Sequence, residues 1–310
     1  MSESKKPIIG TRGSKLALWQ ASYIARLLEE KASAQVELRI IKTKGDKILD
    51  VALSKIADKG LFVKEIENEL LAGGIDLAVH SMKDLPTEIP DGLIIAATTE
   101  REDNRDALIS LQYNNFNELP KGAVVGTSSL RRKAQLLSLR PDLEAAEIRG
   151  NVDTRIKKLQ SGEYQAIIMA IAGLKRLGMA DYVKQVFSVD DFMPAVGQGA
   201  IGIEARAGDA KVLGLLDKIN NRKNLAEVTA ERALMKELQG GCQVPVGAIA
   251  VANDGVIELK ALVASLDGTE IIKGQHRGSS DEAELVGIEL AQRLKSEGAE
   301  KILDEIRKAV

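Results

Sequence analysis

The alternation of strand-like and helix-like segments constrains the fold of this chain more than any other feature. Residues 8–10, 36–41 and 76–79 are short apolar runs typical of strands, whereas residues 14–31 and 62–71 carry apolar side chains at helical spacing. Such alternation favours parallel sheets joined by crossover helices over an all-α or all-β fold.

The same pattern restarts after residues 98–106, a charged segment with the composition of a connector. Further strands are predicted at residues 123–125, 144–148, 166–171 and 200–204. The hydroxyl groups of Thr127, Ser128 and Ser129 suit the amino-terminal turn of the next helix, because they can accept hydrogen bonds from unpaired backbone N–H groups. A second α/β unit is therefore expected.

Beyond residue 220 the pattern changes to one helix, three strands and a final helix, which indicates a small α+β domain. A chain of 310 residues exceeds what one hydrophobic core usually organises. We therefore predict three domains. Domain 1 comprises residues 1–99 and 200–219, domain 2 comprises residues 100–199, and domain 3 comprises residues 220–310.

Composition excludes several classes of protein. Aromatic residues make up only 3% of the chain, which argues against the stacking surfaces of single-strand nucleic-acid binders. The longest apolar run, residues 166–174, is far shorter than the ~20 residues that span a bilayer, and residues 1–7 do not form a secretory signal. One cysteine and two separated histidines predict a reducing cytoplasm, no internal disulfide and no metal site.

Polar segments follow four of the predicted strands, where ligands bind in open parallel sheets. These segments are residues 11–14, 81–84, 127–132 and 149–151. From Thr127 to Arg176, ten basic residues oppose five acidic ones. Because arginine forms paired hydrogen bonds with carboxylates and phosphates, the pattern predicts a site for a small polyanion, although any single arginine is equally consistent with a surface ion pair. No nucleotide-binding glycine motif is present, so no nucleotide cofactor is predicted.

Two single residues are candidates for chemistry. Asp84 follows Lys83 at a strand end, where a carboxylate could offset developing positive charge, although such a position more often belongs to an ordinary loop residue. Cys242 lies in a Gly-Gly-Cys-Gln-Val-Pro turn that could present its thiol. Lone cysteines are usually buried as small apolar residues, and no histidine lies nearby in sequence to activate this one.

Six segments, taken together, resemble the porphobilinogen deaminase family. They read TRGSKLALWQ (11–20), AVHSMKD (78–84), GTSSLRR (126–132), RGNVDTR (149–155), AVGQG (195–199) and GGCQVP (240–245). They occur in order along nearly the whole chain, and one departure, Gly13 in place of a larger residue, lies beside the charged positions.

The resemblance implies an α/β fold of two domains like those of bilobed binding proteins, with mixed, mainly parallel sheets, plus a small α+β C-terminal domain. It implies a transferase of tetrapyrrole biosynthesis that polymerises four porphobilinogen molecules into hydroxymethylbilane, with release of ammonia. The primer would be a dipyrromethane cofactor joined to Cys242 by a thioether. The resemblance further implies a cytoplasmic monomer with no membrane or nucleic-acid partner.

Roles for individual residues also follow from the resemblance. Asp84 would be catalytic by contacting pyrrole N–H groups and stabilising the cation formed when ammonia leaves. The residues implied to hold the cofactor are Cys242, Ser81, Lys83, Asp84, Thr127, Ser129, Arg131 and Arg132. Those implied to hold the substrate or growing chain are Arg12, Ser14, Gln20, Arg149, Asn151, Arg155 and Arg176, with Lys55, Lys59 and Phe62 from an active-site loop.

Two other classes of function remain open from the residues alone. One is a noncatalytic bilobed receptor for a small polycarboxylate, because fold does not determine function. The other is a nucleic-acid binder that uses the basic segment, although that segment lacks interleaved aromatic residues. Neither alternative assigns a role to Cys242.

Overall fold

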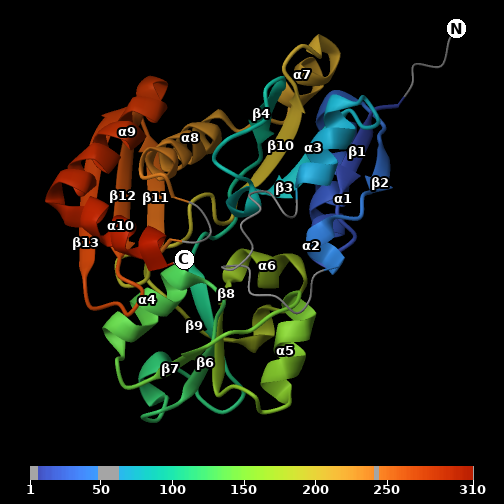
Figure 1. The fold of residues 1–310 in the computed structure, drawn as a ribbon. Coiled ribbons are helices and arrows are strands. Elements are labelled where there is room, and N and C mark those ends of the chain that lie inside the picture. Colours follow the sequence, from blue (N-terminus) through green and yellow to red (C-terminus); the bar gives the residue numbers. More distant parts are fainter. Residues whose placement is uncertain (1–5, 48–62, 241–243, 310) are drawn as a thin grey trace, which may run out of the picture. The chain divides into compact units, whose positions relative to one another are not determined.

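The computed structural model describes residues 6–47, 63–240 and 244–309 (Figure 1). It divides into two compact units. Of the described residues, unit 1 combines those up to Arg101 with Ala200–Leu225. Unit 2 combines Glu102–Gly199 with the chain from Ala226 onward. The division into three domains stays a prediction.

Unit 1 is built on a five-stranded sheet, sheet A. Its strands, in spatial order, are β2 (Glu37–Ile40), β1 (Ile8–Thr11), β3 (Leu77–Ser81), β10 (Ile201–Arg206) and β4 (Leu93–Thr98). Strand β10 is antiparallel to both of its neighbours, so the other four strands run in one direction. The sheet is therefore mixed but mainly parallel.

Helices cover both faces of sheet A. They are α1 (Lys15–Ala32) and α7 (Ala210–Asp217) on one face and α3 (Lys64–Leu71) on the other, and the short helix α2 (Lys44–Lys47) follows β2 in the chain. Because side chains alternate along a strand, Ile9 of β1 packs in the core with α1 and α7, whereas Ile8 packs in the core with α3. Helix α1 begins where the sequence predicts, because the Ser14 hydroxyl accepts a hydrogen bond from Ala17 N at 3.2 Å.

Unit 2 contains a second five-stranded sheet, sheet B, with the same topology. Its strands, in spatial order, are β7 (Glu144–Ala146), β6 (Val124–Gly126), β8 (Ala166–Ala170), β5 (Asp106–Ile109) and β9 (Val183–Val186). Strand β5 is the reversed strand here. Helix α4 (Leu130–Leu139) packs in the core on one face, and α5 (Val152–Gln160) and α6 (Ile171–Arg176) pack on the other.

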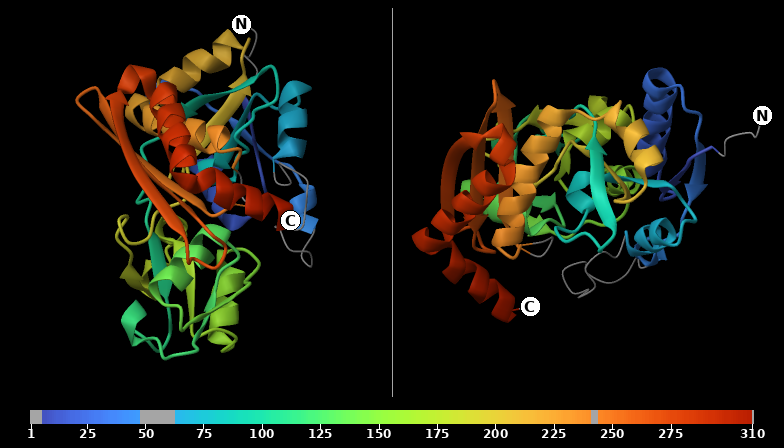
Figure 2. Two further views of the ribbon diagram at one scale, coloured as in Figure 1. Left: turned by 60° about the vertical axis from the view of Figure 1, so that its left-hand side comes forward. Right: turned by 90° about the horizontal axis from the view of Figure 1, so that it is seen from above.

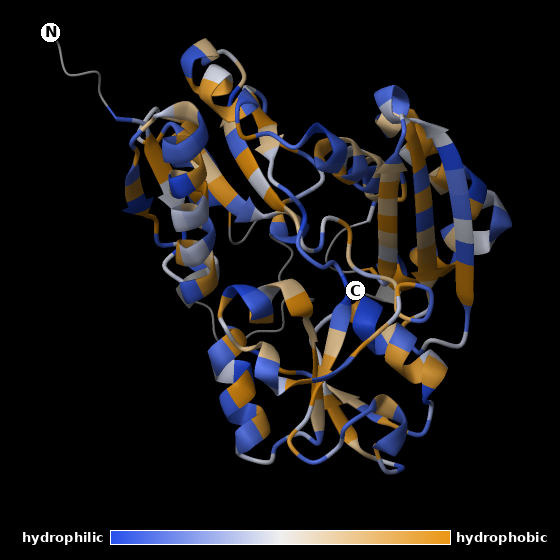
Figure 3. Cartoon of the chain, turned by 180° about the vertical axis from the view of Figure 1, so that it is seen from behind, coloured by the Kyte–Doolittle hydropathy of each residue, from blue (hydrophilic) through white to orange (hydrophobic). Residues whose placement is uncertain are grey.

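The C-terminal part of unit 2 is an antiparallel sheet, sheet C, with helices on one face. Its strands are β11 (Val246–Asn253), β12 (Val256–Ala264) and β13 (Ile271–Ser279), and its helices are α8 (Arg222–Glu237), α9 (Ala283–Leu294) and α10 (Glu300–Ala309). The three helices share one hydrophobic core with β11 and β12, and these elements can be followed in two further views (Figure 2). Strand β13 at the edge is mainly hydrophilic, whereas β12 is mainly hydrophobic (Figure 3).

The predicted fold class, α/β with mixed, mainly parallel sheets and a small α+β part at the C-terminus, is confirmed. Three strands, β4, β5 and β9, were not predicted. Both β5 and β9 have only four residues, and strands this short carry little periodic signal of their own. Within the described ranges, no helix is long and apolar enough to cross a membrane.

A buried group of ionisable side chains lies inside unit 1. Nε2 of His80 in β3 lies 2.9 Å from Oε2 of Glu204 in β10. Glu67 of α3 is also buried. Burial and the neighbouring Glu204 raise the pKa of Glu67 to about 7, although His80 and Lys64 act in the opposite direction.

We predict that Glu67→Gln changes how the stability of unit 1 depends on pH. A carboxyl group whose pKa is raised from 4.5 to about 7 in the folded chain stabilises the fold below pH 4.5. That contribution is lost as the pH rises from 4.5 to 7. The parent should therefore lose up to about 3 kcal/mol more than the variant over this range, since one pKa unit corresponds to about 1.4 kcal/mol.

Denaturant unfolding at pH 4.5 and pH 8, followed by the fluorescence of Trp19 in helix α1, measures this difference within unit 1. The exposed Glu29→Gln on the same helix is the control. Equal pH dependence in the two variants would contradict the prediction.

Candidate functional site

In unit 1, the predicted site residues lie at one edge of sheet A. Strands β1 and β3 are parallel neighbours, so their carboxyl ends reach the same edge. Arg12 and Ser14 follow β1, and Ser81 ends β3. Gln20, buried in α1, donates from Nε2 to Ser81 Oγ at 2.8 Å, which connects these two segments directly.

Asp84 lies in a single 3₁₀ turn, Met82–Asp84, that follows β3. The buried Met82 holds this turn, because its N–H donates to the carbonyl of Ala200 at 3.0 Å and its own carbonyl accepts from Leu85 N at 3.2 Å. Lys83 is half-buried and Asp84 is exposed. Among the residues that the structure describes, no side chain pairs with the Asp84 carboxylate, which leaves it available to a ligand.

In unit 2, the segment after β6 forms the capped start of helix α4. Thr127 Oγ1 accepts from Ser129 N at 3.2 Å, and Ser129 Oγ accepts from Arg132 N at 3.4 Å. Each hydroxyl keeps its own proton for donation to another group. The helix N-terminus, with its partial positive charge, therefore lies at the carboxyl end of a strand, as the sequence predicts.

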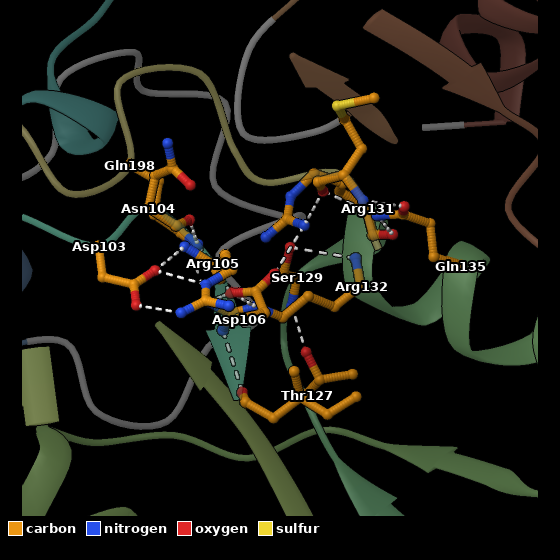
Figure 4. A network of polar contacts seen from close by, with 12 residues as sticks. Asp103, Asn104, Arg105, Asp106, Thr127, Ser129, Arg131, Arg132, Gln135 and Gln198 are labelled. Atoms are coloured by element: carbon orange, nitrogen blue, oxygen red, sulfur yellow. Dashed lines mark hydrogen bonds and ion pairs between the residues drawn. The ribbon is translucent and has the colours of Figure 1, made fainter. Parts of the chain in front are cut away.

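Arg131 and Arg132 share one buried carboxylate, that of Asp106 (Figure 4). Arg131 Nη1 is 2.8 Å from Asp106 Oδ2, and Arg132 donates to Oδ1 from Nη2 at 2.7 Å and from Nε at 3.1 Å. Asp106 is fully buried, and both arginines are less than one-tenth exposed. Arg132 also donates to the carbonyl of Ile168 at 3.1 Å, so backbone as well as carboxylate holds its guanidinium in place.

This cluster carries one net positive charge, because two guanidinium groups oppose a single carboxylate. Burial alone would raise the pKa of Asp106, but Arg131 and Arg132 hold it well below its usual range. Burial lowers the pKa of Arg131, an effect that Asp106 opposes. The buried Arg131 Nε has no hydrogen-bond acceptor in the described part of the chain. The cluster is therefore suited to an acidic ligand.

The remaining predicted arginines of unit 2 donate to partners close to them in sequence or, for Arg176, to the backbone of Gly199. Arg149 Nε donates to Glu147 Oε1 at 2.8 Å, whereas its Nη2 is buried without an acceptor among the described residues. Arg155 Nε donates to the Gly150 carbonyl at 2.8 Å, and Arg176 Nη2 donates to the Gly199 carbonyl at 2.6 Å. Asn151 is exposed at the start of α5.

Four predicted site residues, Cys242, Lys55, Lys59 and Phe62, lie outside the described residues. The roles assigned to all of the site residues stay predictions.

Sequence reasoning missed Asp106 and Gln198, which complete the cluster. Because β5 is antiparallel to β8, it begins at the edge where β8 ends, and Asp106 lies opposite Ala170. Gln198 is fully buried and donates from Nε2 to Asp106 Oδ1 at 2.9 Å. The signals were an acid directly before an apolar run and a glutamine between two glycines, and both acquire meaning only once the strand direction is known.

Comparison with known protein families gives two matching family models, which together cover residues of both units. A family model described as "Porphobilinogen deaminase, dipyromethane cofactor binding domain" matches residues 8–214. A second model, "Porphobilinogen deaminase, C-terminal domain", matches residues 225–296.

Relatives with the same description match nearly end to end. The porphobilinogen deaminase of Syntrophomonas wolfei is 52% identical over 97% of this chain and 98% of its own length. That of Carboxydothermus hydrogenoformans is 51% identical, over 98% of each chain. A solved structure of a putative methionine-binding lipoprotein from Bacillus subtilis gives a TM-score of 0.43 at 13% identity over 71% of this chain and 92% of that one, which is too distant to support an inference.

We predict that Asp106→Asn destabilises unit 2 by about 3–5 kcal/mol, because it leaves two buried guanidinium groups without their counter-charge. Chemical unfolding followed by far-ultraviolet circular dichroism measures the loss. Asp142→Asn is the matched control, since it removes the carboxylate that Arg140 contacts at 2.7 Å in a partly exposed ion pair. Solvent screening should make the control nearly neutral. Similar losses in the two variants would mean that burial of the Asp106 pair has no special importance.

Proposed function

Since this chain belongs to the porphobilinogen deaminase family, we propose that Asp84, Cys242 and the basic residues at the two sheet edges carry out the reaction of that family. The enzyme adds four porphobilinogen molecules in turn to the primer, and each addition forms a carbon–carbon bond and releases ammonia. Hydrolysis of the bond to the primer then frees the linear tetrapyrrole hydroxymethylbilane. Family membership and the dipyrromethane cofactor, both expected from the six sequence segments, are confirmed.

The main support for these residue roles is the cationic cluster of Asp106, Arg131 and Arg132 at the edge of sheet B. The dipyrromethane of this family is made from porphobilinogen and so carries an acetate and a propionate on each ring. Its site must therefore supply several cationic groups or N–H donors. The net positive charge of the Asp106 cluster and the buried N–H groups of Arg131 and Arg149 that lack acceptors within the described ranges fit such a ligand. Thr127 and Ser129 would add hydroxyl donors beside them.

When bound, the dipyrromethane supplies the pyrrole primer on which the chain grows. The protein must hold that primer through repeated additions, and we assign its attachment to Cys242 through a thioether. A thioether is not readily displaced, so Cys242 needs no activating histidine during turnover. Cys242 is thus an anchor, which agrees with the absence of a histidine near it in sequence.

We assign the repeated chemistry to Asp84. Loss of ammonia from the protonated aminomethyl group of porphobilinogen leaves a cation, and a carboxylate held at a fixed position stabilises such charge better than reorganising water does. The Met82–Asp84 turn presents Asp84 as an exposed carboxylate, and the buried Met82 holds the turn to Ala200. Asp84 can also accept hydrogen bonds from pyrrole N–H groups and take part in proton transfer.

Arg12, Ser14, Gln20, Arg149, Asn151, Arg155 and Arg176 are proposed to hold the incoming substrate or the growing chain, together with Lys55, Lys59 and Phe62. We also propose that the enzyme is a cytoplasmic monomer that binds neither membrane nor nucleic acid. Its single cysteine supports a reducing compartment, and its low aromatic content argues against a nucleic-acid partner. Sedimentation of the purified chain should give one species near 33.4 kDa, and a larger stable species would contradict it.

We predict that the purified chain, after denaturation, is heavier than its sequence by two linked pyrrole units. Intact-mass spectrometry measures the excess, which should disappear in Cys242→Ser because the serine hydroxyl cannot replace the thiolate as a nucleophile. A bare chain that is fully active, or an excess mass that persists in Cys242→Ser, would exclude the proposed anchor.

We predict that Asp84→Asn leaves the fold intact, because the side chain is exposed, but lowers the rate of hydroxymethylbilane formation by about a hundredfold or more. Single-turnover assays with porphobilinogen measure the rate, and the unfolding midpoint reports the fold. Asp91→Asn, at an exposed residue on the same unit, is the control. Near-normal turnover in Asp84→Asn would remove this residue from the mechanism.

A further inference from the structure

A segment of unit 2, residues 193–198, is held by hydrogen bonds from both sides. We call this segment the strap. On one side, helix α4 holds its first residue, because the Met193 carbonyl accepts from Arg131 Nη1 and from Gln135 Nε2 at 3.0 Å. Met193 N also donates to Gln135 Oε1 at 2.6 Å. The arginine-bearing helix and the strap are therefore joined through three buried contacts.

On the other side, sheet C and helix α8 hold the strap. Ala248 N of β11 donates to the Pro194 carbonyl at 3.0 Å. Glu231 of α8 is fully buried, and its two oxygens accept from different segments: Oε2 from Gly197 N at 2.7 Å, and Oε1 from Ala250 N of β11 at 2.8 Å. One carboxylate therefore fixes the strap, α8 and β11 to one another.

Gln198 connects the far end of the strap to the cationic cluster. Its Nε2 donates to Asp106 Oδ1 at 2.9 Å and to the Asn104 carbonyl at 2.7 Å, and its Oε1 accepts from Arg132 Nη2 at 3.4 Å. Gly197 and Gly199, on either side of it, have φ angles of 70° and 88°. These φ angles favour glycine, and the bend directs the glutamine side chain inward. The two glycines of the Gly-Gln-Gly motif are therefore explained by the bend, and no nucleotide-binding role is needed.

These contacts form a continuous buried connection from the two arginines to α8 and β11. Those two elements flank Cys242 in the chain, because α8 ends at Glu237 and β11 begins at Val246. A covalently anchored ligand can meet fixed donors only if its attachment point and those donors are held in register. Apolar packing alone allows small shifts between the strap, α8 and β11. Buried hydrogen bonds to one carboxylate define specific positions for all three.

We propose that Glu231 and Gln198 are positioning residues of the cofactor site: through the strap, they hold the elements that flank Cys242 in register with Arg131 and Arg132. The inference rests on the proposed function, because it presumes that the primer is attached at Cys242. Neither residue needs to touch the primer. Their effect is to hold α8 and β11 in register with the arginine N–H groups that would donate to the carboxylates of the primer.

The test compares Glu231→Gln with Glu227→Gln in the full-length chain. Glu227 lies one turn earlier on α8, is also buried, and accepts from Ala252 N of β11 at 3.0 Å, so the two substitutions remove the same charge from the same helix. Gln198→Met is a second variant that removes the donors to Asp106 with little change in size. The first readout is the fraction of chains that carry the primer, measured by intact mass after denaturation.

We expect the primer-carrying fraction to fall by about tenfold or more in Glu231→Gln and in Gln198→Met, and to stay near the parent value in Glu227→Gln. The second readout repeats each substitution in a Cys242→Ser background and compares melting temperatures. A positioning role predicts a larger fall in melting temperature when Cys242 is present than in the Cys242→Ser background, because only the chain with the cysteine has primer contacts to lose.

Equal primer loading in Glu231→Gln and Glu227→Gln, or equal falls in melting temperature in the two backgrounds, would overturn the inference. If Glu231→Gln does not fold, Gln198→Met decides by the same criteria. Failure of the proposed function is recognised separately, because the parent chain itself would then carry no primer mass that depends on Cys242.

Discussion

The buried ion pairs of Asp106 with Arg131 and Arg132 are the interaction on which the rest of the site depends. Two guanidinium groups packed side by side away from water would repel each other and lose their hydration. One carboxylate between them removes the repulsion and orients both, while one positive charge remains. The protein thereby keeps a cationic cluster in place before any acidic ligand arrives, so binding requires little reorganisation.

The reversed strand in each five-stranded sheet has a comparable consequence. In sheet B, β5 brings the buried Asp106 to two arginines, and in sheet A, β10 brings the buried Glu204 to His80. Both carboxylates pair with basic groups that lie in or after a parallel strand. In sheet B the reversed strand places the buried counter-charge of Asp106 at a strand end where predicted ligand-binding residues lie, whereas in sheet A Glu204 lies opposite Ala78 within β3.

Much of the fold could be predicted because local signals agree with the final structure. Helix α1 shows helical spacing of apolar residues and a serine at its start, and Ser129 similarly caps α4. The strands β4, β5 and β9 were missed because a strand is stabilised mainly by its neighbours. The candidate arginines were recognisable by type and position, but their partners were not. Asp106 lies 25 residues before Arg131 in the sequence, and only strand pairing brings the two together.

The sequence by itself determined the family, the α/β class and the chemical character of the site. Side-chain chemistry and the order of strands and helices are local properties, and six ordered segments carry the resemblance. Only the tertiary structure decided which arginine N–H groups already have an acceptor and which buried ones have none among the described residues. Arg131 is a ligand-binding candidate and also the partner of Asp106 and Met193, and Gln198 is a buried connector. Hydrogen-bond partners of this kind depend on the direction of β5 and the path of residues 193–198, which no local pattern specifies.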